Sequence, residues 1–129
     1  MDRNEGDFQM LFDNGQVRTF ASGYQRDTAK DKPQLRLILK AFHGLCAINE
    51  RFEEGAPKYG AHNWFKGAPL STFAESASRH LMKAMAGHTD EKHWQAVGWN
   101  VLCLLDTAKR IELGELPPEL DDIGFCGVP

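Results

Sequence analysis

The sequence has few cysteines and lacks long apolar segments, and each shortage excludes a class of protein. Cys46, Cys103 and Cys126 are widely spaced and form no CxxC motif or cysteine–histidine cluster, so no zinc site is indicated and a reducing compartment suits them. No apolar run approaches the roughly 20 residues that cross a bilayer. The polar start MDRNEGDFQ also lacks the basic and then apolar layout of a signal peptide. We therefore expect a cytoplasmic protein without a membrane partner.

The chain also has little excess charge. Its formal net charge is -3 and it contains no long basic stretch, which argues against nucleic acid as a partner. Apolar residues make up 42% and charged residues 26% of the 129 residues, as in ordinary globular proteins. This length predicts a single domain with one core.

Glycine and proline positions divide the chain into three parts. Residues 1–33 show no sustained period, so we expect an N-terminal arm of loops or a short hairpin. Residues 34–113 form the helical core, and residues 114–129 form a C-terminal tail that contains the Pro117–Pro118 pair.

Three helices are predicted in the core. Apolar residues recur at helical spacing from Leu35 to Phe52, and Gly55 is expected to end this first helix. After a loop over residues 55–70, Thr72 and Glu75 have the spacing of a capping box for a second helix. The third is expected from Thr89 or Asp90 to Gly114. These features predict an all-α helical bundle.

The third helix is apolar on two sides. One stripe faces the expected core, while Trp99 and Cys103 lie on the opposite side. The stripe consists of Trp94, Val97, Val101, Leu104, Leu105 and Ala108. Because the chain has few helices to cover a second apolar face, we expect a partner subunit there and hence a homo-oligomer, a dimer or a tetramer.

Acidic side chains on the first helix are candidate metal ligands. Glu50 and Glu53 are one turn apart, so their carboxylates can converge on a hard cation. Extension of the stripe through Phe42 and Cys46 places Glu53 within the apolar face, where a carboxylate requires compensation. The alternative is a solvated helix end.

Polar residues on the other two helices extend this candidate site. Asp90 can supply a further metal oxygen, His93 can orient water or bind phosphate, and Asn100 shares an edge of the helix with His93. The structural alternative is an N-cap at Asp90 and two amphipathic edge residues. On the second helix the residues that are either structural or functional are Glu75, Arg79 and His80.

The loop between the first two helices could bind a nucleotide. Lys58 and Lys66 supply positive charge for a triphosphate, and Tyr59 and Trp64 offer flat faces for a base. A glycine-containing loop anchored by aromatic residues under the core is the structural alternative.

Three sequence segments together resemble one protein family. They are SGYQRDTAKDKPQL, FEEGAPKYGAHNWFKG followed by SASRHLMKAMAG, and DEKHWQAVGWNVLCLLD leading to LPPELDD. The most specific segment is GAPKYGAHNW, which ends in Asn63 and Trp64. It is followed later by the pair Arg79 and His80. The chain resembles the dATP/dGTP diphosphohydrolases found mainly in phages, which are related to the MazG-like all-α nucleotide pyrophosphohydrolases. For a phage protein, the expected location is the host cytoplasm.

The resemblance implies hydrolysis of purine deoxynucleoside triphosphates between the α- and β-phosphates, with Mg²⁺ or Mn²⁺. It makes Glu50 and Glu53 the first acidic pair and, with His93, the candidate catalytic groups. The second pair departs from the pattern, because Ser78 follows Glu75 and Asn100 stands where related chains have an acid. The candidate metal ligands are Glu50, Glu53, Glu75, Asp90 and Asn100. The candidate substrate-binding residues are Lys58, Tyr59, Asn63, Trp64, Lys66, Arg79 and His80. A nucleotide sensor and a regulatory interaction protein remain alternatives.

Overall fold

The computed structural model describes residues 16–28 and 31–127. They belong to two units, one ending at Lys40 and the other beginning at Ala41. Helices dominate, so the predicted all-α class is confirmed. Among the described residues, no helix combines the length and apolarity needed to cross a membrane.

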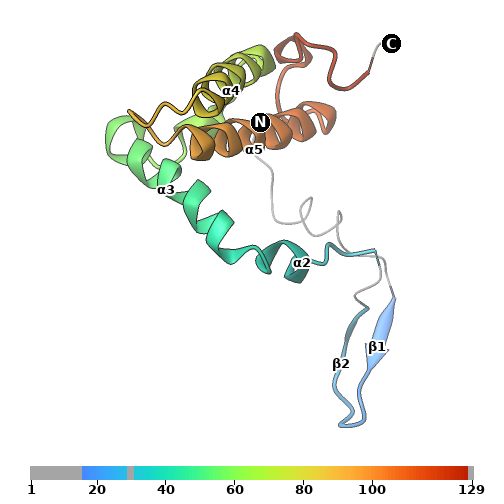
Figure 1. The fold of residues 1–129 in the computed structure, drawn as a ribbon. Helices are drawn as coiled ribbons and strands as arrows, with labels where there is room; N and C mark the ends of the chain where they lie inside the picture. The colour runs from blue at the N-terminus through green and yellow to red at the C-terminus, as the bar shows by residue number, and fades with distance from the viewer. Residues whose placement is uncertain (1–15, 29–30, 128–129) are drawn as a thin grey trace. The chain divides into compact units, whose positions relative to one another are not determined.

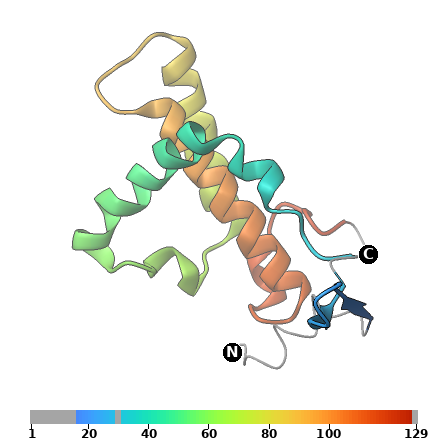
Figure 2. The same ribbon diagram turned by 90° about the horizontal axis from the view of Figure 1, so that it is seen from below.

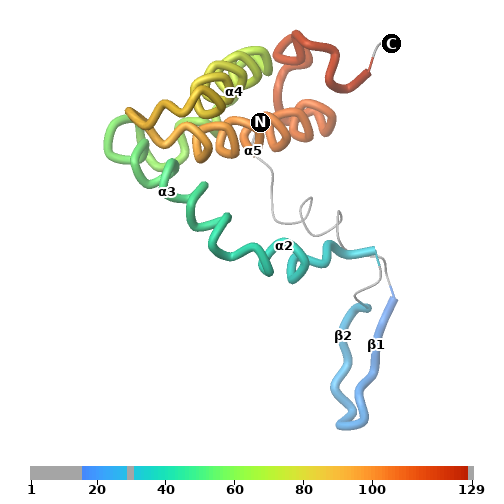
Figure 3. The backbone as a smooth tube through the Cα atoms, in the orientation of Figure 1, coloured from blue at the N-terminus to red at the C-terminus, as the bar shows by residue number. Residues whose placement is uncertain are grey.

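The first unit contains a β-hairpin, one of the two forms predicted for the N-terminal arm. Strands β1 (Val17–Thr19) and β2 (Gln25–Asp27) pair antiparallel, with Val17 opposite Asp27 (Figure 3). The turn is possible because Gly23 adopts a φ of 88°, which favours glycine. A short helix, α2 (Arg36–Leu39), ends the unit. Residues 1–15, 29 and 30 of the predicted arm lie outside the described residues.

The predicted first helix has different bounds in the structure. Its main part is α3 (Phe42–Tyr59), which is separated from α2 by the non-helical Ala41. The expected stop at Gly55 is wrong, because the helix continues through Gly55 and Pro57 and ends before Gly60, whose φ is 93°. Pro57 is tolerated near the helix end, where its missing N–H removes a single backbone hydrogen bond.

Two long helices, α4 (Leu70–Met85) and α5 (His93–Glu112), lie side by side in both views of the ribbon (Figures 1 and 2). The 3₁₀ helix η1 (Asn63–Lys66) lies between α3 and α4, and a second one, η2 (Pro118–Leu120), follows α5. Both contact α5. The helix α5 is therefore the element on which α3, α4, η1 and η2 all pack.

The core lies between α4 and α5. Leu70, Ala108 and Ile111 are buried together, and Leu116 and Leu120 from the C-terminal segment pack against them. On the other side of α5, a Cβ at Gly98 would lie 2.9 Å from Cδ1 of Ile48. Glycine at this position therefore permits the close approach of α3 to α5.

The predicted starts of the second and third helices are wrong. The N-cap of α4 is Pro69 rather than Thr72, so the capping box with Glu75 does not form. Instead, Asp122 from the C-terminal segment accepts hydrogen bonds from the N–H and hydroxyl groups of Ser71. A carboxylate there also interacts favourably with the helix dipole. The helix α5 begins at His93, after a loop that contains Thr89 and Asp90.

The assignment of the two faces of α5 is wrong at several positions, although Leu104 and Ala108 of the predicted stripe do contribute to the core. Cys103 is completely buried, and Trp99 packs against Phe52 of α3 and Phe73 of α4, with ring centroids 5.6 and 6.4 Å apart. By contrast, Trp94 of the expected core stripe is 63% exposed. Helical spacing identified two apolar faces but contained no information on which face the neighbouring helices cover.

Candidate active site

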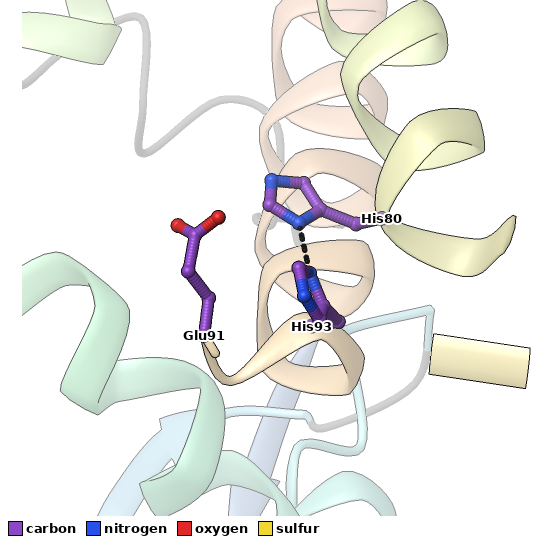
Figure 4. Close-up of side chains that lie close together, drawn as sticks. All are labelled: His80, Glu91 and His93. Carbon is purple, nitrogen blue, oxygen red and sulfur yellow. Dashed lines mark hydrogen bonds between the residues drawn. The ribbon is translucent and has the colours of Figure 1, made fainter. Parts of the chain in front are cut away.

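Two histidines and a glutamate lie close together near the loop that connects α4 and α5, and we call them the histidine cluster. His80 lies on α4, His93 is the first residue of α5, and Glu91 precedes it in the loop (Figure 4). One ligand atom from each of the three lies within 4.8 Å of the others. This is the only group of three or more histidine, cysteine, aspartate or glutamate side chains with such spacing within residues 16–28 and 31–127. These side chains could hold a metal ion.

His93 is fixed at both ring nitrogens. It is only 2% exposed, and its Nε2 lies 2.8 Å from Oδ1 of Asp90, while its Nδ1 lies 2.9 Å from Nδ1 of His80. A carboxylate accepts hydrogen bonds, so Asp90 favours the tautomer with the proton on Nε2 of His93. The lone pair of Nδ1 then points toward His80. The hydrogen bond between His93 and Asp90 also lowers the pKa of Asp90.

The surroundings of His80 favour its neutral form. Burial lowers the pKa of its imidazole, and the positive charge of Arg51 lowers that pKa further. A neutral imidazole has a lone pair that can bind a metal ion or accept a proton.

Arg51 connects this histidine cluster to a neighbouring pocket. Its Nη1 lies 4.0 Å from Oε1 of Glu91 and 3.9 Å from Oε2 of Glu54. The same side chain lines a partly open pocket of about 210 Å³ whose other walls come from α3, η1, α4 and α5. A nucleotide bound in the pocket could therefore extend past Arg51 to the histidine cluster.

The pocket is mainly apolar, and its large side chains are mostly aromatic. Its walls include Tyr59, Asn63 and Trp64, three of the residues predicted to bind substrate, together with Phe52 and Trp99. Trp64 and Trp99 both pack against Phe52, with centroid separations of 5.8 and 5.6 Å. The buried indole N–H of Trp99 has no hydrogen-bond partner within the described chain. Flat aromatic walls with a few polar groups suit a nucleobase.

The η1 side of the pocket is anchored to α5 by Arg110. Its guanidinium lies 3.5 Å from the ring centroid of Phe65, and its Nη1 donates a 2.7 Å hydrogen bond to the carbonyl of Phe65. Glu115 compensates its charge through a 3.4 Å ion pair. Stacking on an aromatic ring while donating to the carbonyl of the same residue suits the planar guanidinium of arginine better than the ammonium of lysine.

Glu50 is not a member of the cluster and is already engaged. Its Oε2 accepts hydrogen bonds of 2.8 Å from Lys92 and 3.1 Å from Gln95. The hydrogen bond from Lys92 is the main reason for the lowered pKa of Glu50. A metal ion at Glu50 would have to displace these donors.

Glu53 is exposed, in contrast to its predicted place within the apolar face. Its Oε1 accepts a 2.7 Å hydrogen bond from Asn49. The expectation failed because Phe42 and Cys46, which defined the stripe, are themselves exposed. The face of α3 that meets α5 passes instead through Ile48 and Phe52.

The other candidate residues are dispersed. Asn100 is buried and donates a 2.8 Å hydrogen bond to the carbonyl of Ala96. Glu75 and Arg79 are exposed on α4, and Lys58 and Lys66 are exposed at the ends of α3 and η1. The structure thus brings together His80, Asp90 and His93, and separately Tyr59, Asn63 and Trp64. It does not gather Glu50, Glu53 and Glu75.

Sequence reasoning missed three residues of this region: Arg51, Glu91 and Trp99. Glu91 had a usable signal, because it stands two residues before His93 and next to Asp90. Arg51 and Trp99 could not be found by spacing alone, since their contacts involve other helices.

Comparisons with known proteins agree with the resemblance seen in the sequence. No curated protein and no solved structure matches the chain. One family model does match, over residues 22–115, which include the histidine cluster and every pocket residue named above. The chain belongs to this family, described as dATP/dGTP diphosphohydrolase, N-terminal, a description that implies a hydrolase acting on a nucleotide.

Proposed function

We propose that the protein hydrolyses purine deoxynucleoside triphosphates between the α- and β-phosphates, releasing pyrophosphate and the monophosphate. The observation that carries this proposal is the aromatic pocket, connected through Arg51 to the histidine cluster. A base in the pocket would leave its phosphates free to extend toward ionisable groups. The family description supports dATP and dGTP as the substrates.

The base would stack on the aromatic walls. Tyr59, Trp64 and Trp99 supply flat faces, and stacking of one base on an aromatic side chain contributes roughly 1–3 kcal/mol. Asn63 can pair with the N6 and N7 edge of adenine, and Arg51 with O6 and N7 of guanine. A pocket with both side chains would accept either purine.

The phosphates would meet positive charge at the rim. Lys58 lies in the last turn of α3, Lys66 ends η1, and Arg79 is adjacent to His80 on α4. All three are exposed and able to move toward a triphosphate. These cations would offset the charge that develops on phosphate oxygens during hydrolysis.

The reaction would use a divalent cation, Mg²⁺ or Mn²⁺. Such an ion supplies electrophilic binding of phosphate oxygens and a lower pKa for the attacking water. Two sets of side chains compete as its ligands. The first is the set of oxygen donors predicted from the sequence, Glu50, Glu53, Glu75, Asp90 and Asn100, which would have to rearrange around the Lys92–Glu50 pair. The second is the histidine cluster, which is already assembled.

Pyrophosphate release from a panel of ribo- and deoxyribonucleoside triphosphates tests the activity. The panel is run with Mg²⁺, with Mn²⁺ and with a chelator. We expect metal-dependent release that is fastest with dATP and dGTP, with the monophosphate as the second product. Purine nucleotide binding without release in either metal would instead support the nucleotide sensor.

A pair of neighbouring variants tests the pocket. Asn63 lines the cavity, whereas the adjacent His62 is exposed and does not. Loss of a bidentate base contact costs about 1–3 kcal/mol, so Asn63→Ala should lower kcat/KM for dATP by about 5- to 150-fold. His62→Ala should leave it unchanged. Equal effects of the two substitutions would mean that the base does not bind in this pocket.

A further inference from the structure

The side chains of the histidine cluster suit a transition-metal ion, and the carboxylate of Asp90 orients one of them. Glu91 contributes oxygen and His80 and His93 contribute nitrogen, from three different segments of the chain (Figure 4). Imidazole ligands suit transition-metal ions such as Co²⁺ and Zn²⁺, and Mn²⁺ accepts them in mixed sites with carboxylates, whereas Mg²⁺ prefers oxygen ligands and retains water. The composition of the cluster therefore distinguishes between the two ions considered for the reaction.

The spacing of the two imidazoles fits ligation of one ion. Their Nδ1 atoms are 2.9 Å apart. Two nitrogens at right angles around an ion, each about 2.1 Å from it, are separated by about 3.0 Å. The same spacing fits a hydrogen bond in which Nδ1 of His80 donates to Nδ1 of His93. An ion can take the place of this hydrogen bond when the proton of His80 moves from Nδ1 to Nε2.

Asp90 orients the buried ligand. Its carboxylate, 2.8 Å from Nε2 of His93, fixes the proton on that nitrogen and leaves the lone pair of Nδ1 for the ion. Metal-binding histidines usually have such a partner, and its loss typically weakens metal binding 10- to 100-fold. Burial of His93 also prevents the ring from turning away into solvent.

Glu91 is the adjustable ligand. Its side chain is 47% exposed, and its ion pair with Arg51 is long, at 4.0 Å. It can therefore move onto an ion without breaking a close contact. In Figure 4 its carboxylate lies beside the two rings.

We propose that His80, Glu91 and His93 bind one divalent transition-metal ion, with Asp90 as a positioning residue, and that this site prefers Mn²⁺, Co²⁺ and Zn²⁺ to Mg²⁺. Three protein ligands leave coordination positions for water or phosphate oxygens. Ion binding stands independently of the proposed function. Only the use of the ion in hydrolysis rests on that function.

Titration of the full chain with Co²⁺, Mn²⁺ and Mg²⁺ tests this site without any nucleotide. After chelator treatment, binding is followed by calorimetry and, for Co²⁺, by visible absorption. We expect one Co²⁺ per chain, at least tenfold tighter binding of Mn²⁺ than of Mg²⁺, and no sulfur-to-cobalt charge-transfer band from Cys46 or Cys126. Equal affinity for Mg²⁺ and Mn²⁺, or a sulfur band, would overturn the assignment.

Variants locate the ion and separate it from surface binding. His80→Ala and Glu91→Gln should each weaken Co²⁺ binding at least tenfold, and Asp90→Asn should weaken it about 10- to 100-fold. His88 is the matched control, because it is exposed in the same loop but outside the cluster. Unchanged binding in both His80→Ala and Glu91→Gln, or an equal loss in His88→Ala, would refute the site. These substitutions avoid the buried His93, and helical circular dichroism verifies that each variant is folded.

The two proposals fail in different ways. A chain that binds Co²⁺ at this cluster but releases no pyrophosphate would retain the metal site and lose the proposed function. A chain that hydrolyses dATP with Mg²⁺, while His80→Ala and Glu91→Gln change neither Co²⁺ binding nor turnover, would retain the function and lose the site.

Discussion

Substitution of Gly98 by alanine tests whether α3 and α5 are held together as closely as the structure requires. In an isolated helix this change stabilises by about 1 kcal/mol, because alanine loses less backbone entropy than glycine. At Gly98, however, the new Cβ would lie 2.9 Å from Cδ1 and 3.0 Å from Cγ1 of Ile48. Helix propensity and packing therefore change the free energy of unfolding in opposite directions.

The packing contribution should be larger. Contacts between carbon atoms are optimal at about 3.5–4.0 Å, so Ile48 or the whole of α3 must move. Cδ1 can turn away, but Cγ1 is closer to the backbone and moves less freely. Overpacking of this kind costs about 1–3 kcal/mol. Set against a helix gain of about 1 kcal/mol, the expected outcome is a net destabilisation of up to about 2 kcal/mol.

Chemical denaturation of four variants measures this balance. Gly44, near the start of α3, is the control because a Cβ there meets nothing within 4 Å. Gly44→Ala should be neutral or stabilise by up to about 1 kcal/mol. Ile48→Ala, alone and combined with Gly98→Ala, completes a double-mutant cycle. Since the smaller residue at 48 makes room for the new methyl group, we expect a favourable coupling energy of about 1–2 kcal/mol.

Two results would refute this reasoning. A Gly98→Ala variant as stabilised as Gly44→Ala would mean that the two helices are farther apart than described. Additive effects of Gly98→Ala and Ile48→Ala would mean that the added methyl group does not meet Ile48.

Two further predictions concern ionisable groups in the second unit. Hydrogen bonds from Ser71 lower the pKa of Asp122, so this carboxylate stabilises the fold above its unfolded pKa of about 3.9 and loses that contribution as the pH falls through the lower folded value. The stability difference between wild type and Asp122→Asn should be constant near neutral pH and shrink under acid; a difference that grows on acidification would contradict the assigned hydrogen bonds. Burial, followed by the charge of Asp106, raises the pKa of Cys103 to about 12, so at pH 8 a thiol reagent should modify the exposed Cys46 and leave Cys103 unmodified until the protein unfolds. Equal labelling rates for these two cysteines in the native protein would show that Cys103 is accessible.

Much of the fold could be predicted from the sequence because it depends on local periodicity. The helical spacing indicated three long helices, and the structure has them as α3, α4 and α5. Their ends were less predictable, since they depend on distant partners. Nothing near Ser71 in the sequence indicates that Asp122, 51 residues later, would accept the hydrogen bonds of its N–H and hydroxyl groups.

Helix faces were predicted less well than helix positions. A helical wheel defines directions only relative to one another, so an exposed apolar residue can define the wrong reference direction. Phe42 did so for Glu53, and Trp94 did so for Trp99 and Cys103. The homo-oligomer stays a prediction, but its candidate surface on α5 moves to the exposed apolar side that includes Trp94, Val101 and Leu105.

The candidate site was predictable where its residues are close in sequence. Asp90 and His93 are three residues apart, and Tyr59, Asn63 and Trp64 lie within one loop region, so each group could be proposed together. Their connection could not be proposed, because it passes through Arg51 on a different helix. Glu50 was predicted as a ligand by its spacing from Glu53, but spacing gives no indication of Lys92, the cation that it contacts.

The helix α5 determines the distance between the pocket and the histidine cluster. His93 at its start belongs to the cluster, Trp99 lines the pocket, and Gly98 between them sets how closely α3 approaches. Arg51 on α3 contacts Glu91 only at 4.0 Å, so a shift of α3 by a few tenths of an ångström changes that contact. If base and metal bind as proposed, Gly98→Ala should therefore reduce dATP turnover more than it reduces Co²⁺ binding, because the cluster lies on α4, α5 and their connecting loop. An equal loss of turnover and Co²⁺ binding in this variant would indicate general unfolding rather than a displaced pocket.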